Sequence, residues 1–379
     1  MLNDKTKALG LIFPNTYDSV VPELTNVRLM ASIPFASRYR LVDFMLSSMA
    51  GSGINNISML VNKNYLSLMD HLGSGREWDL VRKNGGLHMF PPNVERTSTV
   101  YTGRVSAVAG ILDFLREQKE KYVVMADANM AVNFDFKAMI QAHMDSGADV
   151  TCAYKAEEIP DSYIRMRNEQ GFYYTYNIED GRIVKIEVNS KEEGVQNLGM
   201  NVFVVERELL IDLINTAFVR GDRYWERDVL MNSVEKLNIQ GYKFDGYLAR
   251  IAGIKSFFDE NMKLLDDANL DALFTGNTIN TKIRDDNPTR YIKGAKAVNT
   301  LCADGCVIEG DVEDSVLFRG VKVGKGAKVK NCILMQDTVI EDGAVVENII
   351  TDKNVKISAG SEVKGTANYP VYISKSHTV

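Results

Sequence analysis

Residues that commonly bind structural metals are scarce in this sequence, and its few cysteines are not spaced as a metal site. The 379 residues include 4 Cys and 4 His, and the cysteines form no C-x-x-C pair. Cys302 and Cys306 lie close together in the chain, but no histidine or second cysteine pair is near them. This spacing argues against structural zinc and favours reduced, buried thiols, which are usual in cytoplasmic proteins.

The sequence also lacks a surplus of positive charge and long apolar runs. Its formal net charge is -6 at pH 7, whereas proteins that bind nucleic acid carry basic faces. Residues 1–7 have no apolar signal core, and no apolar run reaches the length needed to cross a membrane. We therefore expect a cytoplasmic protein with neither a nucleic-acid nor a membrane partner.

Glycine is missing from the turn where a phosphate-binding loop would be expected. The apolar run from Ala8 to Phe13 predicts a buried first strand, and the polar turn Asn15–Ser19 follows it. Phosphate loops use glycines, whose backbone N–H groups turn towards the anion, together with Lys or Arg. This turn has neither, and the carboxylate of Asp18 would repel a phosphate. The turn thus has the position of a phosphate loop without its chemistry.

The residues that are present predict a soluble protein of at least two domains. With 45% hydrophobic and 25% charged residues, the composition is that of globular proteins, and the length exceeds one ordinary core. Strands alternate with helices over roughly the first 250 residues, which predicts a largely parallel sheet covered on both faces. Asp127 ends one strand, where ligands commonly bind; a metal-binding and a backbone-capping role are both open.

A glycine-rich polar segment, residues 73–86, offers a second candidate site. It contains Trp78, Arg82 and Lys83, which are suited to stacking on a ligand or holding an anion. The alternative is a surface loop that one tryptophan anchors.

The last hundred residues contain a repeat with a period of 17 residues. Cys306, Val323, Ile340 and Ile357 are spaced in this way; four positions further on the residues are small, and six positions further on they are valines. The small residues are Gly310, Ala327, Ala344 and Ser361, and the valines are Val312, Val329, Val346 and Val363. A short fixed period predicts stacked coils, here a three-sided parallel β-helix. Its exposed edges favour packing on another domain or subunit.

Taken together, several segments resemble the ADP-glucose pyrophosphorylase (glucose-1-phosphate adenylyltransferase) family. The matching segments are Tyr39–Phe44, Trp78–Gly86, Gly246-Tyr247, Asn261-Met262 and the repeats ending at Asp352–Val355. The resemblance implies a nucleotidyltransferase-like α/β domain, a left-handed β-helix of hexapeptide repeats and a tetrameric assembly. We place the domains at residues 1–250 and 296–379, with a helical linker at 251–295.

The family reaction joins ATP and a sugar 1-phosphate and releases pyrophosphate, which requires Mg²⁺, cations and backbone donors to hold the phosphates. Several positions that match these groups carry other residues here. The loop glycines fall on Asn15, Thr16 and Asp18 and the loop arginine on Val20; two lysines fall on Met30 and Asn189; the second metal carboxylate falls on Arg250. A further motif, G-T-A-D, reads Gly103–Ser106. Asp127 matches the remaining metal carboxylate, so the resemblance implies that no catalytic set is intact and no cofactor is bound.

The resemblance is greatest to the non-catalytic, D-type subunit of Gram-positive bacteria. It implies a regulatory subunit that assembles with a catalytic subunit, in a mixed tetramer, and modulates ADP-glucose synthesis for glycogen. Arg38, Arg40, Trp78, Arg82 and Lys83 are candidate effector or interface groups, with surface packing as the alternative.

Three other functions are weighed against this one. The first is an active sugar-phosphate nucleotidyltransferase with altered site residues, and the second is a stand-alone sensor of a sugar phosphate or nucleotide. The third, a hexapeptide acyltransferase, is disfavoured because the sole histidine near the β-helix is His377. The sequence contains no nucleophile elbow or P-loop motif.

Overall fold

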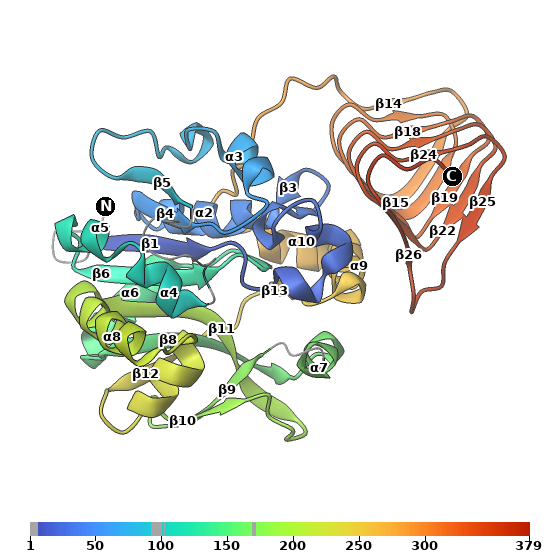
Figure 1. The fold of residues 1–379 in the computed structure, drawn as a ribbon. Helices are drawn as coiled ribbons and strands as arrows, with labels where there is room; N and C mark the ends of the chain where they lie inside the picture. The colour runs from blue at the N-terminus through green and yellow to red at the C-terminus, as the bar shows by residue number, and fades with distance from the viewer. Residues whose placement is uncertain (1–6, 92–100, 102, 169–171) are drawn as a thin grey trace.

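The computed structural model describes residues 7–91, 101, 103–168 and 172–379. Within these residues the first region is built on a nine-stranded sheet (Figure 1). Its strands lie in the order β5 (Gly86–Phe90), β4 (Asn56–Leu60), β1 (Ala8–Phe13), β6 (Tyr122–Asp127), β11 (Val195–Glu206), β8 (Val150–Glu158), β12 (Ile239–Lys243), β10 (Arg182–Val188) and β9 (Tyr174–Glu179). Of these nine strands, seven run in one direction and β11 and β10 run in the other, which confirms the mostly parallel sheet.

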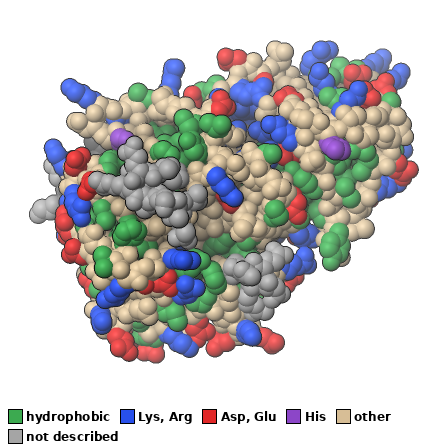
Figure 2. Space-filling model, viewed as in Figure 1, with side chains coloured by type: hydrophobic (Ala, Val, Ile, Leu, Met, Phe, Trp, Pro, Cys, Tyr) green, Lys and Arg blue, Asp and Glu red, His purple; other side chains and the backbone are tan. Residues whose placement is uncertain are grey.

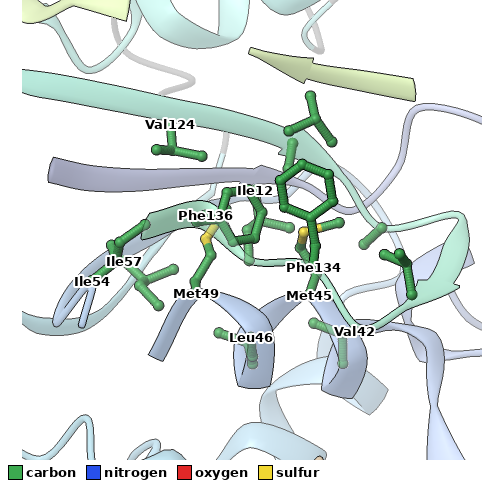
Figure 3. Packing of buried hydrophobic residues seen from close by; sticks show 14 of the residues in the cluster. Ile12, Val42, Met45, Leu46, Met49, Ile54, Ile57, Val124, Phe134 and Phe136 are labelled. Carbon is green, nitrogen blue, oxygen red and sulfur yellow. The ribbon is translucent and has the colours of Figure 1, made fainter. Parts of the chain in front are cut away.

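Helices cover both faces of this sheet, because its central strands are apolar on both sides. In β1, Ile12 packs into one buried cluster, whereas Leu11 and Phe13 pack into another. The first cluster lies under α2 (Leu41–Gly51), α3 (Leu66–Leu72) and α6 (Phe136–Ser146); the second lies under α4 (Arg104–Ala109), α5 (Leu112–Glu117) and α8 (Arg207–Arg220). Figure 3 shows Met45 and Met49 of α2 directed at Ile12 and the neighbouring strands.

Shorter elements complete the first region. They are η1 (Asp18–Val20), α1 (Pro22–Thr25), η2 (Met30–Ser32), β2 (Pro34–Phe35), β3 (Tyr39–Arg40), η3 (Arg76–Trp78), β7 (Met130–Val132), α7 (Asp161–Asn168), η4 (Trp225–Leu230), η5 (Met231–Ser233) and β13 (Leu248–Arg250). No helix in the described part of the chain is long and apolar enough to cross a membrane.

Three helices connect the first region to the last. They are α9 (Ile254–Met262), η6 (Lys263–Leu265) and α10 (Asp267–Phe274), which lie between the sheet and the coils in Figure 1. Phe257 shares one buried cluster with Phe44 of the first region and Ile333 of the coils. A buried ion pair adds to this contact, since Arg28 Nη2 binds Asp352 at 2.6 and 2.9 Å. The predicted linker therefore contributes to a common core.

The last region is a parallel β-helix, as predicted. One sheet contains β14 (Arg290–Tyr291), β16 (Val307–Ile308), β18 (Lys322–Val323), β21 (Val339–Ile340) and β24 (Lys356–Ile357). The other contains β15 (Lys296–Cys302), β17 (Asp311–Leu317), β19 (Lys328–Lys330), β20 (Ile333–Leu334), β22 (Val345–Glu347), β23 (Ile349–Thr351), β25 (Glu362–Lys364) and β26 (Val371–Ile373). All pairings within these two sheets are parallel.

The predicted repeat register is confirmed at most positions and wrong at one. Val323 pairs with Ile340, and Ile340 with Ile357, as the 17-residue spacing predicts. The residue paired with Val323 in the preceding coil, however, is Ile308 and not Cys306. The reason is that the corner after Ile308 is shorter than the corner after Val323, while the following strands return to the 17-residue spacing.

Side-chain size and backbone conformation explain why certain residues recur at the corners. Asp314, Asn331 and Asn348 adopt φ angles of 47°, 50° and 52°, a left-handed conformation that Asn and Asp tolerate better than other non-glycine residues. At Gly310 an added Cβ would lie 2.4 Å from the backbone oxygen of Ala327. The residues that recur in the repeat therefore reflect two structural constraints, which are a left-handed backbone at the corner and a close approach between neighbouring coils.

Candidate functional site

The principal candidate site is a cavity of about 300 Å³ at the carboxyl ends of β1 and β4. The ends of parallel strands are a common place for ligands, because the chain diverges there into loops. The cavity is lined by Phe13, Asn15, Thr16, Tyr17, Ser19, Val20, Leu60, Asn62, Tyr101, Gly103, Arg104, Ala107, Phe172, Tyr174, Asn201, Tyr224 and Glu226. Among these lining residues, the formally charged side chains at neutral pH are Arg104 and Glu226.

Asp127, the predicted remnant of the metal site, is fully buried behind this cavity at the end of β6. Its Oδ1 accepts a hydrogen bond from Thr16 Oγ1 at 2.7 Å. Its Oδ2 accepts hydrogen bonds from Asn201 Nδ2 at 2.9 Å and from Arg104 Nη2 at 2.5 Å. Both carboxylate oxygens are therefore occupied by groups of the chain itself. The backbone-capping role that the sequence left open for Asp127 is replaced by these side-chain bonds.

Arg104 joins Asp127 to a second buried carboxylate. Its Nη1 contacts Glu226 in η4, and the side chains of Arg104, Asp127 and Glu226 are 7%, 0% and 3% exposed. Burial alone would lower the pKa of Arg104, but the charge and hydrogen bond of Asp127 outweigh it and raise the pKa. The guanidinium is therefore permanently charged. It also lies 5.3 Å from the centre of the Phe13 ring, within the range of a cation–π contact.

The backbone around Arg104 is held by a close contact with the loop before η4. An added Cβ at Gly103 would lie 2.2 Å from the carbonyl oxygen of Arg223, and that same oxygen accepts a hydrogen bond from the Val105 N–H at 3.3 Å. Glycine at this position therefore allows α4 to begin beside the loop. As a result Arg104 is directed at both carboxylates.

These donors do not fit Mg²⁺, the metal that the resemblance implies for active members. Mg²⁺ needs free carboxylate oxygens in an octahedral arrangement, whereas those of Asp127 already accept three bonds. At the position of the second metal carboxylate, Arg250 binds Glu157 at 3.0 Å and the Gly199 carbonyl oxygen at 3.0 Å. Across the residues that the structure describes, no group of three His, Cys, Asp or Glu side chains is placed to hold a metal ion.

The turn after β1 differs from its prediction in the direction of its carboxylate. Asp18 does not line the cavity; its Oδ1 accepts from the Met30 N–H at 2.7 Å and its Oδ2 from Asn15 Nδ2 at 2.6 Å. Burial raises the pKa of Asp18 to about 6. The expectation that this carboxylate faces the phosphates is therefore corrected, because it organises the turn from inside. Thr16 and Val20 do line the cavity.

The remaining lost positions lie apart from one another. Asn189 adopts a φ of 52°, and its side chain accepts a hydrogen bond from the Tyr173 N–H at 3.0 Å. Met30 is 1% exposed and belongs to the apolar cluster that contains Phe35. Neither Asn189 nor Arg250 lines the cavity described above, and Asp18 does not line it either.

The candidate groups at residues 73–86 divide into a core residue and surface residues. Trp78 is 2% exposed, and its Nε1 donates to Ser47 Oγ at 3.1 Å. It therefore anchors the segment, as the second of the two alternatives predicted, and its ring is not exposed for a ligand to stack on. Arg82 and Lys83 are exposed, and Arg82 pairs with Asp79. Their effector or interface role stays a prediction.

Arg38 and Arg40 lie where the first region meets the β-helix. Arg38 is exposed and 3.9 Å from Asp304 of the coils, while Arg40 Nη1 donates to the Ser67 carbonyl oxygen at 2.7 Å. Burial lowers the pKa of Arg40 to about 10. Burial, followed by repulsion from Arg40 and Arg28, also lowers the pKa of Lys353 to about 7. Figure 2 shows a group of Lys and Arg side chains in the upper part of the molecule, near the boundary between the first region and the β-helix, among others spread over this face.

Sequence reasoning missed the residues that complete the network at Asp127. Arg104 falls in the segment that replaces the G-T-A-D pattern, so the sequence marks its position but does not predict its pairing with Asp127 and Glu226. Asn201 and Glu226 carried no signal. They come from β11 and η4, and their meeting depends on how distant segments pack.

Comparison with known proteins matches both regions. The nucleotidyl transferase family matches residues 21–235, and the GlmU-like, C-terminal hexapeptide family matches residues 282–368. Glycogen biosynthesis protein GlgD of Bacillus subtilis (strain 168) is 33% identical over 373 residues, which cover 97% of this chain and 95% of that protein. GlgD of Geobacillus stearothermophilus is 36% identical over 326 residues, or 85% of this chain and 83% of the relative. Glucose-1-phosphate adenylyltransferase of Bacillus mycoides (strain KBAB4) is 29% identical over 372 residues, or 96% of each.

The fold and these matches define a nucleotidyl transferase-type domain followed by a hexapeptide-repeat β-helix. More particularly, the chain belongs to the ADP-glucose pyrophosphorylase family, alongside the glycogen biosynthesis proteins GlgD. The resemblance in the sequence is thereby confirmed.

Proposed function

We propose that this chain is a regulatory, catalytically silent subunit of glucose-1-phosphate adenylyltransferase. It assembles with a catalytic subunit, in a tetramer, and modulates the ADP-glucose synthesis that supplies glycogen. Similarity to GlgD over nearly the whole chain supports this proposal. The observation that carries it is the occupied carboxylate of Asp127, whose oxygens bind Arg104, Thr16 and Asn201.

The charges at the cavity support a silent site. Asp127, Glu226 and Arg104 together carry a net charge of about -1, since two carboxylates face one guanidinium. A nucleoside triphosphate and a sugar phosphate would bring many more negative charges to this place. Each missing transition-state contact typically costs about 10² to 10³ in rate, so turnover by this chain alone should be negligible.

Regulation requires only that the chain contact two states of its partner differently. The open coil edges of the β-helix are suited to subunit contact, because they leave backbone groups unpaired.

For the effector, we propose an anion held by Arg40 and Lys353 at the junction of the two regions. Arg28 pairs with Asp352, the neighbour of Lys353, so that cations of both regions meet here. Burial, followed by repulsion from Arg40 and Arg28, lowers the pKa of Lys353, and a bound anion would offset this repulsion. We expect assembly and regulation to take place in the cytoplasm.

The first experiment measures ADP-glucose formation from ATP and glucose 1-phosphate, with Mg²⁺, by the purified chain, by the catalytic subunit of the same organism and by their mixture. We expect the chain alone to be at least about 10²-fold slower than the catalytic subunit. The mixture should elute as one complex and differ from the catalytic subunit in rate or effector response. Substantial turnover by the chain alone would favour the active-enzyme alternative.

A second experiment pairs this chain with a catalytic subunit whose own metal-binding carboxylate has been replaced. We expect the mixed complex to form and to be inactive, because neither site is complete. Activity in this complex would place a working site in the present chain. Failure to form any complex, together with binding of glucose 1-phosphate or ATP by the chain alone, would favour the stand-alone sensor.

A third experiment tests the proposed anion site with Arg40→Ala and Lys353→Gln in the mixed complex. We expect both variants to shift the effector titration to higher concentrations. Lys322→Gln, an exposed change on the β-helix, is the matched control. Unchanged titrations for both junction variants would exclude the site.

A further inference from the structure

The network around Arg104 resembles a metal centre in which the ion is replaced by a side chain. A guanidinium is held between two carboxylates of distant segments, Asp127 at the end of β6 and Glu226 in η4. All three side chains are at least nine-tenths buried. Arg104 also packs between two aromatic rings, with its guanidinium carbon 5.3 Å from the centre of Phe13 and 5.7 Å from that of Phe203.

We infer that Arg104 is a resident cation that takes the place of a divalent metal ion at Asp127 and excludes the ion from the cavity. This inference deepens the proposed function and rests on it, since it names the residue that keeps the site silent. It assigns that role to Arg104 and not to Arg250, which is bound to Glu157.

The chemistry of the guanidinium explains why the exclusion is stable. An Arg side chain stays protonated at any accessible pH, so it cannot release its ion pair with the carboxylate by losing a proton. Removing it from the cavity would leave Asp127 and Glu226 buried beside each other without a counter-charge, which is strongly unfavourable. A hydrated Mg²⁺ approaching through the cavity therefore finds both oxygens of Asp127 already bonded to side chains.

The substitution also changes which ligands the cavity accepts. A metal ion can coordinate phosphate oxygens and a carboxylate together, whereas a guanidinium whose Nη atoms already bind two carboxylates cannot. Apart from Arg104 and Glu226 the cavity lining is uncharged, and it includes Tyr101, Phe172, Tyr174 and Tyr224. The inference therefore excludes metal–polyphosphate complexes as ligands of this cavity.

The test is a titration of the full chain with Mn²⁺ alone, followed by electron paramagnetic resonance of the free ion. The wild-type chain should leave the free-ion signal unchanged, as should Arg104→Lys, which keeps the positive charge. Arg104→Ser frees Asp127 and Glu226 and should bind Mn²⁺ at least tenfold more tightly than wild type. The double variant Arg104→Ser/Asp127→Asn should lose this binding.

A thermal-shift measurement covers the case in which Arg104→Ser folds poorly. Mn²⁺ should raise the melting temperature of Arg104→Ser and leave that of the wild type unchanged. Tight Mn²⁺ binding by the wild type that disappears in Asp127→Asn would overturn the inference, as would a folded Arg104→Ser variant that gains no binding. If Arg104→Ser is unfolded with and without Mn²⁺, the wild-type and Asp127→Asn titrations decide. Failure of this inference thus appears in the metal titrations of the isolated chain and its variants, whereas failure of the proposed function appears as turnover or as the lack of a partner complex.

Discussion

The β-helix and the cavity beside Asp127 are built on opposite principles. In the β-helix each coil repeats the one before it, so Val323, Ile340 and Ile357 meet the same neighbours in turn. In the cavity no residue repeats another, and Asp127 is held by side chains from three separate segments. The contacts that stabilise the β-helix are therefore local and can be predicted along the chain, whereas the site depends on a few charges from distant segments. Four substitutions test this difference between the two regions.

The largest effect is expected from Arg104→Ala, which removes the cation between Asp127 and Glu226. Breaking a buried ion pair leaves an uncompensated charge and costs about 3 to 5 kcal/mol of folding free energy. Chemical denaturation of the two proteins measures the loss. Arg116→Ala is the control, because Arg116 is 49% exposed and pairs with Asp113 at the surface; we expect a change below about 1 kcal/mol. Equal losses for the two variants would contradict the buried network.

The second effect concerns the β-helix core. Ile340 is fully buried and paired on both sides, so Ile340→Ala should cost about 2 to 5 kcal/mol through lost contacts and a cavity. Because Ile340 lies in a buried cluster formed by residues of the coils, the loss should be concentrated in the last region. Hydrogen exchange measures where protection falls. Lys322→Ala, an exposed change on the same sheet, should alter stability by less than about 0.5 kcal/mol.

The third effect tests whether the corners of the repeat are equivalent. Gly310→Ala would place a Cβ against the backbone of Ala327, and such overpacking should cost about 1 to 3 kcal/mol. Ser361→Ala changes the same repeat position in a later coil to the residue found at Ala327 and Ala344. It should be nearly neutral, within about 0.5 kcal/mol. Equal melting temperatures for the two variants would show that no close approach occurs at Gly310.

The smallest effect is a pH dependence near the cavity. Burial raises the pKa of Asp18 to about 6 from an ordinary value near 3.8, so the folded chain binds more protons than the unfolded chain between these values. The stability from this group is therefore complete below about pH 4 and is lost as the pH rises through about 6, by up to about 1 kcal/mol per pH unit. Asp18→Asn should remove this slope from denaturation curves, whereas Asp113→Asn at the surface should keep it. A slope that persists in Asp18→Asn would assign it to another group.

Much of the fold followed from local patterns. The alternation in β1 and the helix patterns predicted a sheet covered on both faces, because each face of a strand carries every second residue. The 17-residue repeat predicted the coils, and its Asn and Asp positions proved to be left-handed corners. Cys306 was placed out of register because a corner that is shorter by a few residues leaves no mark on composition or hydropathy.

The cavity was less predictable, because the direction in which a charged side chain points depends on tertiary contacts. The sequence singled out Asp18, Trp78 and Arg250 as notable residues. It did not predict that Asp18 bonds to the Met30 N–H, that Trp78 is buried or that Arg250 pairs with Glu157. The same residue types at the surface would have had the properties first expected of them.

The two-part architecture and the lack of glycines in the turn after β1 follow from the sequence, since both depend on residues that are neighbours along the chain. The pairing of Asp127 with Arg104, and the contact of Glu226 with the other end of the guanidinium, depend on the tertiary fold. A buried charge is stable only when packing places an opposite charge or a hydrogen-bonding group beside it. Since these partners come from distant segments, no single segment of the sequence predicts the pairing.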